Sequence, residues 1–131
     1  MPSFALSAHT GAPLEEVWKL LHDPSRYSEW WEGIETVRPG PATGTGTDYT
    51  IWPDGYPDFP MAQHMDVTPA GVTVSCLVSD LVFRWQLGEA GAGTSIAVEV
   101  EIPEREAHRL ADQQRYVRRS LDRLAALALT G

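Results

Sequence analysis

A series of short alternating segments, followed by one long helical segment, is the feature that most constrains the fold of this chain. Between residues 34 and 102, apolar side chains recur at every second position in short segments that Gly, Pro and Asp separate. That period is typical of half-buried antiparallel strands joined by tight turns, here expected at residues 39–41, 54–55, 69–71 and 91–93. After Pro103 the period changes to 3.6 for about 25 residues, which predicts a long C-terminal helix. Its expected buried stripe contains Leu110, Gln114, Val117, Leu121, Leu124 and Ala128.

The N-terminal part of the chain predicts one strand and two short helices. Residues 3–9 alternate between apolar and polar side chains, as a half-buried strand does. Residues 13–21 have apolar side chains at helical spacing, and Asp23 and Pro24 then supply the N-cap and first residue of a second helix through about Trp31. The sequence therefore predicts an α+β fold: a curved antiparallel sheet of about six or seven strands wrapped around a long C-terminal helix, with two short helices after the first strand.

Length and charge limit the domain organisation and the partners. The 131 residues, 43% of them hydrophobic, have the size of one domain, which we assign to residues 1–131. A net charge of -8 argues against nucleic acid as a partner. The start has no basic region, and no run of about 18 apolar residues occurs, so we expect a cytoplasmic protein without membrane insertion. We expect a monomer or a homodimer.

Cysteine content bears on redox and metal chemistry. Cys76 is the single cysteine, which excludes an internal disulfide and a zinc site made of several cysteines. His64 and Asp66 are two residues apart, but their position in the alternation predicts that they point away from the interior of the sheet. We therefore expect no metal and no cofactor.

Residues on the inward face of the predicted sheet, with those facing it from the helix, define a candidate ligand site. Most are apolar or aromatic, and a few carry amide or thiol groups, which suits a small hydrophobic, ring-bearing molecule held by few hydrogen bonds. The alternative is that they pack as ordinary core. The candidate ligand-binding residues are Ile51, Met61, Gln63, Met65, Val74, Cys76, Phe83, Trp85 and Val98 on the strands and Gln113 and Val117 on the helix.

Two of the five tryptophans, Trp30 and Trp31, are adjacent at the end of the second short helix. Neighbouring residues on a helix point about 100° apart, so both side chains cannot face the same pocket. We expect one of them in the core and the other at the ligand site.

The segment "GAPLEEVWKLLHDPSRYSEWW" resembles the helix-turn-helix opening of the START-like superfamily, also called SRPBCC, which has the Bet v 1-like helix-grip fold. The segments "GTDYTIWPDG", "VTPAGVTVSC", "LVFRWQL" and "GTSIAVEVEI" look like its successive strands, and "RRSLDRLAALA" is similar to its closing helix. The resemblance includes the polyketide cyclase/dehydrase group. It implies a cavity between sheet and long helix, which different members use for lipid carriage, metabolite binding, cyclisation or contact with chaperones.

Resemblance to the cyclase group implies a pocket that folds a poly-β-ketone chain and stabilises an enolate. Tyr49 and Tyr116 are the candidate catalytic residues that this sequence offers, with the Gln63 amide. No arginine or histidine has an inward position, so we expect no cationic group for the enolate. We therefore predict binding of an aromatic or polyketide-like metabolite, with cyclisation or dehydration as a further activity. The alternatives are a lipid or metabolite carrier without catalysis and an interaction domain like the Hsp90 activators.

Residues 52–60, "WPDGYPDFP", leave two interpretations open. The three prolines stiffen this segment, and its three aromatic residues could cover the mouth of a cavity as a lid or support dimerisation. Alternatively, it is an ordinary hairpin connection with exposed aromatic side chains.

Overall fold

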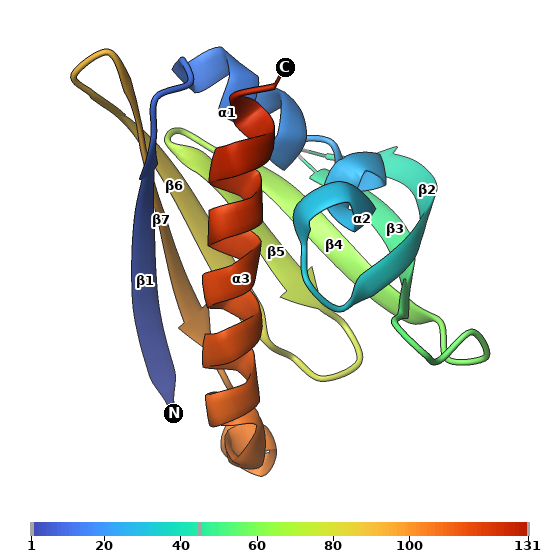
Figure 1. Cartoon of the computed structure of the whole chain (residues 1–131). Helices are drawn as coiled ribbons and strands as arrows, with labels where there is room; N and C mark the ends of the chain where they lie inside the picture. Colours follow the sequence, from blue (N-terminus) through green and yellow to red (C-terminus); the bar gives the residue numbers. More distant parts are fainter. Residues whose placement is uncertain (1, 45, 131) are drawn as a thin grey trace.

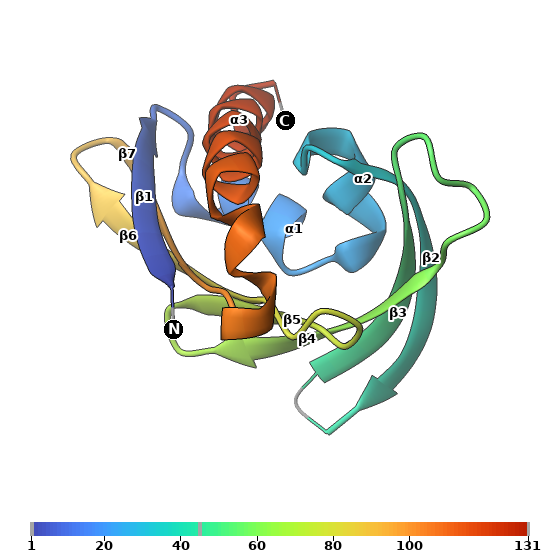
Figure 2. The ribbon, with the colours of Figure 1, turned by 90° about the horizontal axis from the view of Figure 1, so that it is seen from below.

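The computed structural model describes residues 2–44 and 46–130 and confirms the helix-grip fold. Seven antiparallel strands form one curved sheet in the order β1-β7-β6-β5-β4-β3-β2, and the long helix α3 lies within its concave face (Figures 1 and 2). The strands are β1 (Ser3–Thr10), β2 (Ile34–Thr43), β3 (Gly46–Pro53), β4 (Met61–Thr68), β5 (Gly71–Cys76), β6 (Val82–Ala90) and β7 (Gly93–Glu101). The helices are α1 (Leu14–Leu21), the 3-10 turn η1 (Pro24–Arg26), α2 (Tyr27–Trp30), the 3-10 helix η2 (Glu104–Arg109) and α3 (Leu110–Ala128).

The two short helices connect opposite edges of the sheet. Strands β1 and β2 are consecutive in the sequence but lie at opposite edges of the sheet: β1 pairs with β7 at one edge, and β2 pairs with β3 at the other. Helices α1 and α2 therefore cross the concave face beside α3, as Figure 2 shows. They cover one end of the concave face, and this arrangement decides where a cavity can remain.

The corner between the short helices has the cap that the sequence predicts. The Asp23 side chain accepts a hydrogen bond from the backbone N–H of Ser25 at 3.0 Å, and Pro24 is the first residue of η1. Buried aromatic side chains then tie α2 back to α1. The Tyr27 hydroxyl donates to the Leu21 carbonyl at 2.7 Å, and the Trp30 indole N–H donates to the carbonyl of Leu20 at 3.1 Å. The corner is thus part of the hydrophobic core.

Helix α3 buries a stripe close to the predicted one, with one exchange. Val117, Leu121, Leu124 and Ala128 are buried as expected, but Gln114 is exposed. Ser120 is buried instead, because its hydroxyl donates to the Tyr116 carbonyl at 2.7 Å and accepts from the backbone N–H of Glu32 at 2.9 Å. Within the described residues, no helix combines the length and the apolar character that crossing a membrane requires.

One predicted turn is wrong. Residues 39–41, Pro-Gly-Pro, were expected to form a tight connection, but they lie within strand β2. An edge strand tolerates proline because one row of its backbone groups needs no partner, and β2 is the last strand of the sheet. The pairing of β2 with β3 also shifts its register between Pro39 and Ala42, which relieves the ladder locally.

On the outer face of the sheet, a histidine lies between two carboxylates. His64 Nδ1 is 2.6 Å from Asp48 Oδ1, and His64 Nε2 is 3.0 Å from Asp66 Oδ1. These side chains point away from the concave face, as the alternation predicts. Hydrogen bonding to Asp48, followed by the effects of Asp66, raises the pKa of His64 above its usual value, although partial burial opposes the shift. The neighbouring Gly46 leaves room for this arrangement, because a Cβ there would lie 2.6 Å from His64 Nε2.

The raised pKa of His64 predicts a pH dependence of stability. The folded state binds the His64 proton more strongly than the unfolded state does. The contribution of His64 to the free energy of unfolding is therefore complete below the unfolded pKa of about 6.5, and it is lost as the pH rises through the folded pKa. In urea unfolding at a series of pH values, His64→Gln should flatten this decline. His9→Gln is the control, because the His9 ring contacts a neutral group, the Ala90 carbonyl, at 3.3 Å, whereas His64 contacts two carboxylates. Equal slopes for the wild type and His64→Gln would contradict the prediction.

Candidate ligand-binding cavity

A cavity of about 790 Å³ lies between the N-terminal half of α3 and the β3–β6 part of the sheet. Its lining residues place it toward the end of the concave face that α1 and α2 leave uncovered, beside the β3–β4 and β5–β6 connections. The lining comprises Trp31, Glu32, Gly33 and Ile34 after α2; Ile51, Pro53, Asp54, Tyr56 and Phe59 from β3 and the loop after it; Met61, Gln63, Cys76, Ser79, Leu81 and Phe83 from β4 to β6; and His108, Arg109, Asp112, Gln113 and Tyr116 from η2 and α3.

Trp31 forms one wall of this cavity, and contacts with α3 hold it in place. The next residue, Glu32, is anchored by Arg123, whose guanidinium lies 3.0 Å from its carboxylate, and by Arg119 at 3.6 Å. The backbone N–H of Glu32 also donates to Ser120. The Trp31 ring packs edge to face against the Phe83 ring at a centroid distance of 5.0 Å, so two aromatic side chains form this part of the cavity wall.

Gln63 is a polar residue in the sheet wall of the cavity. Tyr49, its partner on the neighbouring strand β3, contacts it from outside the lining. The Tyr49 hydroxyl donates to Gln63 Oε1 at 2.8 Å, and both side chains are buried. Burial, reinforced by Tyr27 and Cys76, raises the pKa of Tyr49 well above its usual value. Tyr49 is therefore a neutral hydrogen-bond donor and does not form part of the lining itself.

Contrary to the expectation from the sequence, an arginine and a histidine do reach the cavity. His108 and Arg109 line it from η2, the turn before α3. Arg109 Nε lies 3.3 Å from a carboxylate oxygen of Glu106, while Arg105 forms an ion pair with Asp80 and thereby ties η2 to the β5–β6 connection. Strand alternation and helical spacing do not apply to these two residues, because they lie in η2, between the last strand and α3.

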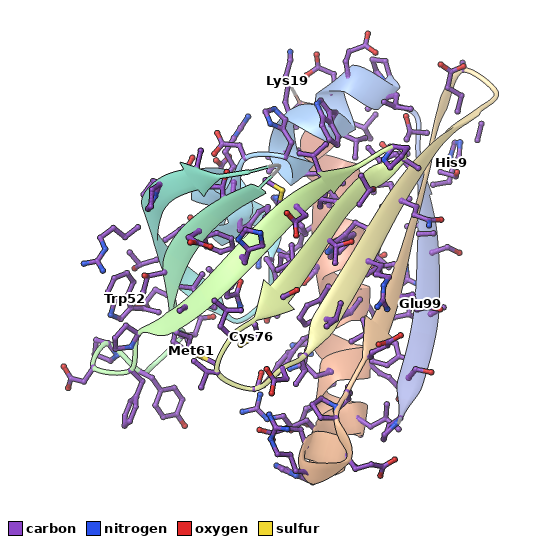
Figure 3. All side chains as sticks on the ribbon, turned by 180° about the vertical axis from the view of Figure 1, so that it is seen from behind. His9, Lys19, Trp52, Met61, Cys76 and Glu99 are labelled. Atoms are coloured by element: carbon purple, nitrogen blue, oxygen red, sulfur yellow. The ribbon has the colours of Figure 1, made fainter. Side chains whose placement is uncertain are left out.

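The mouth of the cavity carries exposed aromatic side chains from residues 52–60. Tyr56 and Phe59 line it, are 58% and 64% exposed, and meet each other at a centroid distance of 6.0 Å. Trp52 belongs to β3 and lies under the guanidinium of Arg38; Figure 3 shows it at the outer margin of the sheet, apart from Met61 and Cys76. Two of the three aromatic residues thus flank the opening, and closure as a lid stays a prediction.

The predicted site residues separate into two groups. Trp31, Ile51, Met61, Gln63, Cys76, Phe83, Gln113 and Tyr116 line the cavity. Trp30, Tyr49, Met65, Val74, Trp85, Val98 and Val117 are buried in the core and are not part of the lining. All of the strand residues share the inward face, but the short helices and α3 fill the other end of that face. Ligand contact by the first group stays a prediction.

Most of the lining residues that the sequence did not predict come from loops, from η2 or from the ends of strands and helices. These are Glu32, Gly33, Ile34, Pro53, Asp54, Ser79, Leu81, His108, Arg109 and Asp112. Alternation and helical spacing carry no information on the direction of loop side chains, although the aromatic and proline content of residues 52–60 did suggest a position at the mouth.

Chemically, the cavity combines an apolar interior with charged groups that are largely neutralised at its helical side. Asp112 pairs with Arg115 at 2.6 Å, and the carboxylate of Glu32 pairs with the arginines of α3. Cys76 is a free thiol, 4% exposed. Among residues 2–44 and 46–130, no three or more His, Cys, Asp or Glu side chains are arranged so that they could hold a metal ion. The arrangement suits binding of an uncharged, largely apolar molecule that carries a few polar atoms.

Comparison with known proteins adds a family and a set of similar folds. The model of a family described as polyketide cyclase / dehydrase and lipid transport matches residues 1–128. A search of curated proteins found no match. The ZhuI aromatase/cyclase from Streptomyces sp. R1128 is similar over 97% of this chain and 93% of its own, with a TM-score of 0.77 and 14% identity. A protein from Thermus thermophilus is similar over 98% of both chains, with a TM-score of 0.74 and 14% identity.

The di-domain aromatase/cyclase StfQ from the steffimycin biosynthetic pathway is also similar. The match covers 98% of this chain and 50% of StfQ, with a TM-score of 0.77 and 8% identity. At such low identities the structural likeness establishes the fold alone.

Proposed function

Because the chain belongs to the polyketide cyclase / dehydrase and lipid transport family, we propose that it binds a small hydrophobic molecule, aromatic or polyketide-like, in the cavity beside α3. The observation that carries this proposal is the cavity itself. Its volume of about 790 Å³ falls in the range of small-molecule sites, and its interior is formed by Trp31, Ile51, Met61, Leu81 and Phe83. A cytoplasmic location and a monomeric or homodimeric state are part of the same proposal.

Native mass spectrometry of the protein purified from its own host tests the proposal directly. We expect a stoichiometric adduct whose extracted component is an aromatic or polyketide-like compound. As a second readout, naphthalene derivatives should change the tryptophan fluorescence, because Trp31 forms part of the wall. An empty protein whose fluorescence responds to none of these compounds would refute binding in the cavity.

Cyclisation of the bound molecule is a second candidate function, and the groups at the helical side of the mouth favour it. In an aldol closure, a base removes the proton next to a carbonyl, the enolate carbon bonds to a second carbonyl carbon, and the new alkoxide takes up a proton; dehydration then releases water. His108 can act as the base, and Arg109 and Tyr116 can donate hydrogen bonds to the enolate oxygen. His108, once protonated, can return this proton to the alkoxide, so one group serves both proton transfers of the ring closure.

If the protein cyclises a β-polyketone, Arg109→Gln and Tyr116→Phe should each lower turnover by about 10- to 100-fold, because each removes a donor to the developing oxyanion. The measurement is product formation from a poly-β-ketone by chromatography, with circular dichroism to check the fold. Arg84→Gln is the matched control, because Arg84 lies on the outer face of β6, outside the lining, and pairs with Glu101 at 2.7 Å. Unchanged turnover in both test variants would show that neither residue stabilises the oxyanion, whereas absence of product with the wild type would leave binding or carriage as the function.

A further inference from the structure

A buried phenol holds the Gln63 amide in one orientation at the sheet wall of the cavity. The hydroxyl of Tyr49 lies 2.8 Å from Gln63 Oε1, and the two side chains are 3% and 5% exposed. A primary amide has an acceptor end and a donor end. Since Tyr49 engages the acceptor end from behind, the N–H groups at the other end are what Gln63 presents to the cavity that it lines.

The opposite orientation of the amide is disfavoured by the same burial. Burial raises the pKa of Tyr49, so the phenol keeps its proton and must donate it. If the amide were flipped, an N–H group would face the phenol oxygen, and Gln63 Oε1 would no longer accept the phenol proton. A buried donor without an acceptor is unfavourable, and Gln63 Oε1 is the acceptor that the described structure provides.

The surroundings of Gln63 make its N–H groups effective in selecting a ligand. Met61 precedes it by two residues on the same face of β4, and Cys76 is its partner on the neighbouring strand β5. Thioether and thiol groups compete only weakly for hydrogen bonds. Hydrogen bonds are stronger in such an apolar site than at the solvated mouth, where Arg109 and His108 lie.

We propose that Gln63 recognises a carbonyl or comparable oxygen acceptor on the bound molecule and that Tyr49 is the positioning residue that aims the amide. The proposal rests on the proposed binding function and specifies its ligand: a hydrophobic ring compound with an acceptor oxygen at its inner end. A hydrocarbon of the same shape leaves the amide N–H groups without a partner and binds more weakly.

A pair of isosteric probes tests this specificity. 2-Acetylnaphthalene carries a carbonyl oxygen, and 2-isopropenylnaphthalene has a methylene group in its place. Isothermal titration calorimetry should give the wild-type protein an affinity for the ketone about 10- to 100-fold higher than for the hydrocarbon. Gln63→Met should reduce this ratio to about one, with little change in the affinity for the hydrocarbon.

Tyr49→Phe separates positioning from a merely structural role. Loss of the hydroxyl frees the amide to rotate, so the affinity ratio should fall while the affinity for the hydrocarbon holds. General damage to the cavity would lower both affinities alike and would contradict the proposal. Gln114→Met, which changes an exposed amide of α3 outside the lining, is the matched control and should preserve the ratio.

The outcomes distinguish this inference from the proposed function. Equal binding of both probes by the wild type overturns carbonyl recognition and leaves cavity binding intact, whereas binding of neither probe overturns both. An unchanged ratio in Gln63→Met also overturns the inference. If Gln63→Met does not fold, an unchanged affinity ratio in Tyr49→Phe is by itself enough to overturn the inference.

Discussion

Replacing Trp30 with alanine is expected to lower the free energy of unfolding by about 3–5 kcal/mol, because the surroundings cannot collapse into the space left by a buried indole. Trp30 is fully buried and stacks on Trp31 at a centroid distance of 5.3 Å. It also meets Trp85 edge to face at 5.2 Å, and its N–H donates to the Leu20 carbonyl. The variant therefore loses packing between α2 and the sheet together with a buried hydrogen bond.

Guanidinium unfolding followed by circular dichroism measures this effect. Trp52→Ala is the matched control, because Trp52 is only half-buried and contacts the Arg38 guanidinium at the margin of the sheet. The control should lose about 1 kcal/mol or less. Comparable losses in the two variants would contradict the assignment of Trp30 to the core. Trp30→Phe should fall between them, because it keeps an aromatic ring but loses the donor to Leu20.

Replacing Cys76 with phenylalanine is expected to weaken binding of naphthalene-sized ligands by at least about 100-fold, or about 2.7 kcal/mol. The Cys76 side chain lines the cavity next to Gln63, so a phenyl ring there occupies space that a ligand needs. Because the ring extends into an existing cavity, the cost in stability should stay within about 1–3 kcal/mol. Calorimetric titration with 2-acetylnaphthalene measures the affinity, and thermal unfolding measures the stability.

Ser75→Phe provides the control for this experiment. Ser75 precedes Cys76 on β5 and pairs with His64 on the outer face of the sheet. A phenyl ring there adds the same group to the same strand but leaves the cavity unchanged, so the affinity should stay at the wild-type value. Unchanged affinity in Cys76→Phe would show that ligands bind elsewhere.

Some elements of this protein could be predicted from the sequence, because they depend on local periodicity. The alternation of Gln63 with His64, and of Cys76 with Ser75, assigned each side chain to one face of the sheet. The N-cap of Asp23 likewise depends on its immediate neighbours. Pro39 showed the limit of such reasoning, because its place within β2 depends on β2 being an edge strand.

What the sequence by itself determined was the order of elements and the face of the sheet to which each strand residue belongs, because both follow from the period of the chain. Only the tertiary structure decided which inward residues line a cavity. Cys76 and Val74 share a face of β5, yet only Cys76 reaches the cavity. The structure also brought Arg109 to the same cavity, because η2 is tied to the β5–β6 connection by a contact between residues distant in the sequence. The physical reason is that contacts between distant elements, which no local period encodes, decide which part of the concave face is filled.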